Sequence, residues 1–241
     1  ISHWVLLAEG WRRRFLALGA GALGALAQAP LGLTPALIPS LMVAVWLIDG
    51  ETGGPSVISP PALGGAARDG WWFGFGYFLA GLWWIGAAFL VETDEFAWAM
   101  PLGIIGLPAG LAFFFALAFA LARLLWMPGA GRIFALGFGI AAAEYLRHWL
   151  FTGFPWNTYG QALAVWLVPA QAASVIGAEG LTLIAVLIFA APATLADTRR
   201  APWRPVRLAL VDLALLLGFG LGRLMLHGGL RASDSPADQV A

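Results

Sequence analysis

Long hydrophobic runs, separated by short polar or Gly/Pro-rich connections, recur along the whole chain. A helix needs about 20 mostly apolar residues to cross the hydrocarbon part of a bilayer. By that measure the pattern predicts about seven membrane-crossing segments, all of them helical. These segments run roughly over residues 15–29, 36–48, 70–91, 98–126, 132–150, 174–195 and 206–226.

Three stretches interrupt this pattern. Residues 49–69 are rich in Gly, Pro and Ser, which favours a loop with an interfacial turn. Residues 152–160 follow the fifth segment and contain Pro155, which disfavours helical backbone at the residue before it. The apolar residues 163–173 are too few to cross a bilayer, so we expect them to lie along the membrane interface.

The composition agrees with a membrane location. Hydrophobic residues make up 61% of the 241 and charged residues 11%, and the mean hydropathy is +0.83. A soluble domain carries about 25% charged residues, so this chain could not cover a water-facing surface. We therefore predict an all-α integral membrane protein, a bundle of about seven transmembrane helices with a non-helical, outer-side turn after the fifth. Residues 1–230 would form this domain, and residues 231–241 a polar tail.

The basic residues predict an orientation, because short cytoplasmic loops are enriched in Arg and Lys. All thirteen basic residues are Arg. With the N-terminus inside, the far side receives only Arg147, Arg223 and Arg231. The other ten fall on the cytoplasmic side, and they are Arg12, Arg13, Arg14, Arg68, Arg123, Arg132, Arg199, Arg200, Arg204 and Arg207. The sequence thus predicts a cytoplasmic N-terminus and a tail on the opposite side.

The candidate functional residues surround the predicted turn. Glu144 and Arg147 are three residues apart and so share one face of the fifth segment. They could form a structural ion pair at the headgroup level, with Trp156 in the aromatic belt. Ionisable residues within a membrane segment also justify a functional hypothesis. The turn itself supplies four candidate binding residues, which are Phe154, Pro155, Trp156 and Asn157.

Other kinds of chemistry find little support in the sequence. Glu179 lies near the start of the sixth segment, where a carboxylate interacts favourably with the helix N-terminus, so we assign it a supporting role. The three His residues have no metal-ligand spacing, and there is no Gly-rich phosphate loop; we predict no metal and no cofactor. The absence of Cys excludes a thiol nucleophile from this chain. A net charge of zero without a basic stripe argues against nucleic-acid binding.

Four motifs in this order resemble the N-terminal membrane domain of the apolipoprotein N-acyltransferase family, over nearly the whole chain. They are residues 74–84 (GFGYFLAGLWW), 144–147 (EYLR), 152–157 (TGFPWN) with Gly160, and 177–180 (GAEG). The resemblance implies transfer of an acyl chain from a membrane phospholipid to the N-terminal cysteine amine of a lipoprotein, through a thioester. It also implies a multi-pass protein of the bacterial inner membrane with a periplasmic tail.

The resemblance assigns catalysis to another part of the protein. In the family the catalytic Cys, Glu and Lys belong to a nitrilase-like domain that follows the seventh helix, and this chain contains neither Cys nor Lys. Residues 231–241 would begin the linker to that domain, through which the lipoprotein substrate would bind. The chain would then be the membrane platform, without catalytic residues, and Phe154, Pro155 and Trp156 would help to line the opening for acyl chains.

The sequence leaves two other functions open. The chain could be a catalytically inactive, shortened relative that serves as a lipid-binding or scaffold subunit of a larger membrane complex. It could also be a small transporter, although the segments lack central charges and no inverted repeat is visible. The intact mass of the native polypeptide separates the first two functions, because a mass far above 25.5 kDa would favour the acyltransferase.

Overall fold

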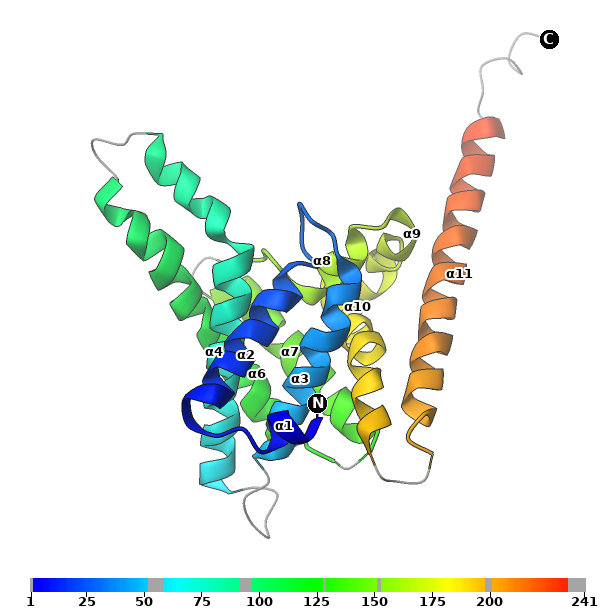
Figure 1. Cartoon of the computed structure of the whole chain (residues 1–241). Coiled ribbons are helices and arrows are strands. Elements are labelled where there is room, and N and C mark those ends of the chain that lie inside the picture. Colours follow the sequence, from blue (N-terminus) through cyan, green and yellow to red (C-terminus); the bar gives the residue numbers. More distant parts are fainter. Residues whose placement is uncertain are drawn as a thin grey trace, which may run out of the picture.

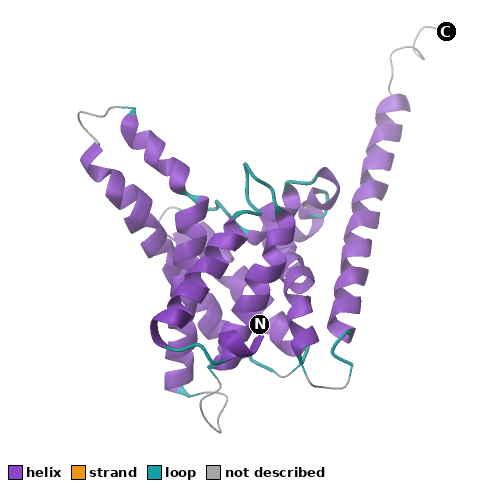
Figure 2. Ribbon diagram, in the orientation of Figure 1, coloured by secondary structure: helices purple, strands orange, loops and turns teal. Residues whose placement is uncertain are grey.

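The computed structural model describes residues 2–51, 59–91, 97–127, 129–150, 153–197 and 201–233, and every secondary-structure element in these ranges is helical (Figures 1 and 2). The predicted all-α class is therefore confirmed for this part of the chain. The elements are α1 (Ser2–Leu6), α2 (Gly10–Ala25), η1 (Thr34–Ala36), α3 (Leu37–Gly50), α4 (Pro60–Gly81), η2 (Trp83–Leu90), η3 (Ala97–Ala99), η4 (Leu102–Gly106), α6 (Leu107–Leu124), α7 (Gly131–Trp149), α8 (Tyr159–Ala164), α9 (Leu167–Ala170), α10 (Ala173–Ala190), η6 (Ala191–Ala196) and α11 (Arg204–Ser233). Thr152, Arg199, Arg200 and the predicted tail beyond residue 233 lie outside the described residues.

Within the described residues, three helices are long and apolar enough to cross a bilayer. They are Ala97–Leu124, Ala173–Ala196 and Arg204–Leu226, with mean hydropathies of 2.3, 2.1 and 1.9. A fourth crossing results if α4 and η2, which are bent by 50° to each other, form one span. The seven crossings predicted from the sequence are not confirmed. Helices α2 and α3 have only 16 and 14 residues, and α7, which has 19 residues but contains Arg132, Glu144 and Arg147, is not among the qualifying helices.

The structure corrects two predicted boundaries. The expected loop over residues 49–69 ends early, because α4 begins at Pro60. The Ser59 hydroxyl accepts a hydrogen bond from the Ala62 amide at 3.4 Å, and Pro60 suits the first helical position. The predicted segment 70–91 is also not one straight helix, since α4 stops at Gly81 and the chain bends there into η2.

Helix α4 packs against α2 on one side and α6 on the other. Close approach to α2 depends on two glycines that face the opposite backbone. A Cβ added at Gly76 would collide with the Leu18 carbonyl of α2, and one at Gly21 would collide with the Phe73 carbonyl of α4. Small residues allow such backbone contact between helices in a membrane, where dispersion and hydrogen bonding drive association. Aromatic side chains form the core between α4 and α6. They include Phe73, Phe78 and Phe115, each less than 5% exposed.

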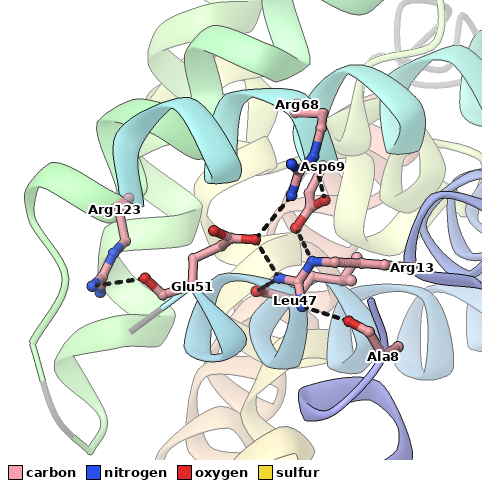
Figure 3. Close-up of polar contacts among 7 residues, drawn as sticks. All are labelled: Ala8, Arg13, Leu47, Glu51, Arg68, Asp69 and Arg123. Atoms are coloured by element: carbon pink, nitrogen blue, oxygen red, sulfur yellow. Dashed lines mark hydrogen bonds and ion pairs between the residues drawn. The ribbon is translucent and has the colours of Figure 1, made fainter. Parts of the chain in front are cut away.

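One end of the bundle, which we call the arginine end, contains a buried charged network (Figure 3). Arg13 on α2 is 5% exposed, and its side chain points between α3 and α4. It forms ion pairs with Asp69 at 2.6 Å and Glu51 at 3.0 Å, and it donates a hydrogen bond to the Leu47 carbonyl. Arg68 reaches Glu51 from outside at 3.2 Å. The network therefore joins α2, α3 and α4.

A second group of charges continues the network toward α7. Arg132 forms ion pairs with Asp49 at 3.1 Å and Asp197 at 2.7 Å, and the Trp126 indole donates to Asp49 at 3.0 Å. Arg123 donates to the Glu51 carbonyl at 3.4 Å. These contacts bring the ends of α3, α6, α7 and η6 together. The two groups together contain four carboxylates and four arginines, so their charges balance. Charges that are buried away from water need such opposite charges nearby.

Candidate functional site

The opposite end of the bundle, which we call the turn end, contains the non-helical stretch that the sequence predicts. Residues 153–158 follow α7 and precede α8, and none of them is helical. Gly153 and Asn157 have φ values of 84° and 54°, in the left-handed region that Gly and Asn tolerate best. Phe154 donates its backbone N–H to the Arg147 carbonyl at 3.1 Å, so the turn folds back onto the end of α7.

Glu144 and Arg147 hold this turn from one face of α7. The Arg147 guanidinium donates from Nη1 to the Trp156 carbonyl at 2.7 Å. Glu144 accepts from the Tyr159 backbone N–H at 2.9 Å and from the Thr182 hydroxyl of α10 at 2.6 Å. Both charged residues are at most 3% exposed. The mutual ion pair considered from the sequence is not among the ion pairs of the described residues, because each side chain bonds instead to a backbone group at the turn.

Further residues that the sequence reasoning missed complete the turn end. Thr158 and Gln161 form a capping box at the start of α8, a pattern that the spacing Thr-x-x-Gln could have revealed. Gln28, beyond the end of α2, donates from its side-chain nitrogen to the Tyr77 hydroxyl at 2.6 Å and to the Thr158 carbonyl at 3.0 Å. Tyr77 and Tyr159 stack at 5.2 Å. The turn is thus tied to α2, α4, α7 and α10.

Glu179 lies apart from this network. Its carboxylate is 2.7 Å from Nδ1 of His148, near the end of α7. Gly177, with a φ of 73°, breaks α10 two residues before Glu179. The carboxylate is therefore near the start of a new helical run, as the sequence predicts. Its contact with the end of α7 supports the same end of the bundle from outside.

The turn separates two cavities. The first, which we call the apolar groove, has a volume of about 750 Å³ and lies between α6 and the end of α7. Its lining includes Phe113, Phe114 and Leu117 of α6, together with Phe154 of the turn. Arg147 is the one charged residue among the residues that line it. The volume is within the range of small-ligand sites, and the lining suits a hydrocarbon chain.

The second cavity, which we call the indole cavity, has a volume of about 520 Å³ on the other side of the turn. Trp156 and Trp84 line it, and their rings meet edge to face at 6.2 Å. Trp156 is 54% exposed, so it does not belong to the packed core. The Asn157 side chain also lines this cavity and lies close to Gly81, where a Cβ would collide with it. Phe154 and Trp156 thus line different cavities.

The four predicted binding residues consequently occupy one turn, and the supporting residues surround it. Among the described residues, no group of three His, Cys, Asp or Glu side chains could hold a metal ion. The fold and the site together define a helical membrane domain in which a non-helical turn, fixed by buried charges, separates a lipid-sized apolar groove from an aromatic cavity.

Comparison with known proteins identifies the family. Residues 20–191 match the family model described as the apolipoprotein N-acyltransferase N-terminal domain. The chain belongs to this family, so the resemblance noted from the sequence motifs is confirmed. It is 52% identical, over its whole length, to an apolipoprotein N-acyltransferase of Rhodopseudomonas palustris, and 46% identical over 98% of its length to one of Agrobacterium fabrum. It spans only 43% and 44% of those two relatives.

Proposed function

We propose that this chain is the membrane domain of an apolipoprotein N-acyltransferase. In the complete enzyme an acyl chain would pass from a phospholipid to the N-terminal cysteine amine of a lipoprotein. The relatives named above carry this enzyme name, and they extend well beyond the part that this chain matches. A thiol nucleophile would come from that further part, because this chain contains no Cys. The role of this chain is then to admit and orient lipid.

The observation that carries this proposal is the apolar groove beside a turn that is fixed by hydrogen bonds. Two buried charged side chains of α7 each make one of these bonds, Arg147 with the Trp156 carbonyl and Glu144 with the Tyr159 amide, so the turn is pre-organised. An acyl chain in the groove would lie against Phe154 and the aromatic side chains of α6. Trp156 offers a broad apolar ring with one N–H donor, which suits the boundary between acyl chains and headgroups.

Replacing Trp156 by alanine should therefore lower acyl transfer much more than it lowers the amount of folded protein. The aromatic ring contributes contact area at a site that water partly reaches, and loss of such an anchor reduces activity by roughly tenfold or more. The measurement is N-acylation of a diacylglyceryl peptide by the full-length protein in defined phospholipid, normalised to the folded protein recovered.

Trp149→Ala is the matched control. Trp149 ends α7 close to the turn in sequence, is 72% exposed, and has a ring contact with Tyr145 of its own helix. It fits the description of an aromatic-belt anchor, so its loss should leave transfer nearly unchanged. If the two variants lose activity in the same proportion as folded protein, Trp156 has a structural role only.

We further propose seven membrane crossings, with the arginine end on the cytoplasmic side and the turn end on the periplasmic side of a bacterial inner membrane. The short helices α2 and α3 would cross together with the turns that follow or precede them. The asymmetry of arginines supports this orientation, since Arg13, Arg68, Arg123 and Arg132 gather at one end of the bundle. Because the chain has no Cys, single engineered cysteines can test the proposal without background labelling.

In intact cells, a cysteine at Ser2 should resist a membrane-impermeant thiol reagent, whereas cysteines at Ser174 and Ser235 should react. Ser174 is exposed at the start of α10, beside the turn end. Labelling after cell lysis gives the total reactive amount at each position. The opposite pattern would reverse the orientation, and equal reactivity at Ser2 and Ser235 would mean an even number of crossings.

A further inference from the structure

The arginines near the arginine end fall into two groups. Arg13, Arg68 and Arg132 form ion pairs with carboxylates inside the bundle, as described above. None of the ion pairs among the described residues involves Arg12 or Arg14, at the start of α2. These two positive charges are therefore not offset by a carboxylate in the way that the buried ones are.

Arg12 lines a third cavity, of about 830 Å³, between α1 and the start of α2. We call it the foot cavity. Exposed apolar side chains form much of its wall, above all Trp4 (80% exposed), Leu7 (78%) and Trp11 (62%). Val5, which is buried in the core, fixes α1 against α3, so that α1 forms a defined wall of the cavity. In Figure 1 α1 lies at the lower edge of the bundle, at the end opposite α8 and α9.

Arg14 does not line the foot cavity itself, but it stacks on Trp11, which is one of the lining residues. The Arg14 guanidinium lies 4.6 Å above the Trp11 ring, and Trp11 contacts the edge of Trp72 on α4 at 6.2 Å. Trp residues prefer the membrane interface, where an apolar ring and a polar N–H can both be satisfied. Arginine binds phosphate with a planar fork of donors. An apolar wall with guanidinium groups at the interface matches an amphiphile with an anionic head.

We propose that the foot cavity binds one anionic phospholipid of the leaflet at the arginine end. Its phosphate would lie near Arg12, with the Arg14 charge beside Trp11 adding a second, longer-range attraction, and its acyl chains would lie against Leu7, Trp11 and Leu16. This site is at the opposite end of the bundle from the apolar groove, so it would serve anchoring and not acyl donation. Basic groups just outside a membrane helix attract anionic headgroups in this way. The proposal rests on the membrane location proposed above and does not depend on acyl transfer.

One carboxylate also lines the cavity. Glu9 opposes anion binding, and its side chain makes no capping hydrogen bond with α2. Removing the Glu9 charge should therefore raise the affinity for an anionic lipid without loss of a helix cap.

The test is lipid binding to the purified chain in detergent, measured by native mass spectrometry with phosphatidylglycerol and phosphatidylcholine of identical acyl chains. The wild-type protein should bind phosphatidylglycerol more tightly. The double substitution Arg12→Gln with Arg14→Gln should weaken phosphatidylglycerol binding by roughly 30-fold, as two lost basic contacts imply, and leave phosphatidylcholine binding nearly unchanged. Glu9→Gln should strengthen phosphatidylglycerol binding by roughly fivefold, a gain that misfolding cannot produce.

The control is Arg204→Gln with Arg207→Gln at the start of α11. That helix start also has a stacked pair, since Arg207 lies 5.0 Å above Trp203, but neither arginine lines the foot cavity. The control should retain wild-type phosphatidylglycerol binding to within about twofold. Equal losses in both double variants would mean that diffuse charge attracts the lipid and would overturn the site. Equal wild-type affinity for the two lipids would overturn it as well.

Discussion

Replacing Arg13 by glutamine should strongly destabilise the bundle. Its guanidinium forms ion pairs with Asp69 and Glu51 and bonds to the Leu47 carbonyl (Figure 3). Without it, Asp69, which is fully buried, keeps only the longer ion pair with Arg68 at 3.7 Å and cannot recover its hydration. Breaking a buried ion pair by removing one partner costs about 3–5 kcal/mol. The expected result is a fall of roughly 10 °C in the thermal unfolding midpoint of the detergent-solubilised protein.

The neighbouring Arg12→Gln variant provides the control, because it removes the same charge from an exposed position. It should change the midpoint by no more than about 2 °C. Adding Asp69→Asn to Arg13→Gln should recover part of the lost stability, since it removes a buried negative charge that has lost its main partner. If the effects of the two substitutions are simply additive, Arg13 and Asp69 are not energetically coupled and the network is not a unit.

Replacing Glu144 by leucine should release the turn. The Tyr159 backbone N–H and the Thr182 hydroxyl would both lose their acceptor, in a region that water cannot reach. A hydrogen bond to a charged group contributes about 1.5–3 kcal/mol, so exchange of the Tyr159 amide should accelerate by roughly tenfold to hundredfold. Hydrogen–deuterium exchange of peptides covering residues 153–161 measures this effect, and acyl transfer by the full-length protein should fall with it.

Glu144→Gln separates the hydrogen bonds from the charge. Glutamine keeps a carbonyl oxygen that can accept from the Tyr159 amide, and its amide group can still bond to the Thr182 hydroxyl. Exchange in residues 153–161 should then stay within about threefold of wild type. Fast exchange in both variants would mean that the carboxylate charge itself positions the turn, through its attraction to Arg147. Slow exchange in both would remove Glu144 from the turn's support.

The sequence by itself determined the helical membrane class, the family and the location of the turn. These features depend on local information. Hydropathy over about 20 residues indicates whether a segment lies in lipid or in water. Pro155, between Gly153 and Asn157, disfavours continuation of a helix that has already begun. The start of α4 also belongs to this class, because Ser59 followed by Pro60 is a local helix-start signal. The predicted loop over residues 49–69 was wrong from residue 60 onward, because its overall Gly, Pro and Ser content was given more weight than this signal.

Only the tertiary structure decided which groups the buried charges contact. Glu144 and Arg147 share a helix face, and spacing alone favoured a mutual pair, yet each bonds to the turn that folds back over α7. Arg13 finds its partners 38 and 56 residues away. Hydrophobic periodicity shows which face of a helix is buried, but it does not identify which other helix covers that face. Long-range polar contacts, and the cavities between helices, arise when several helices pack together, so they follow from the assembled bundle.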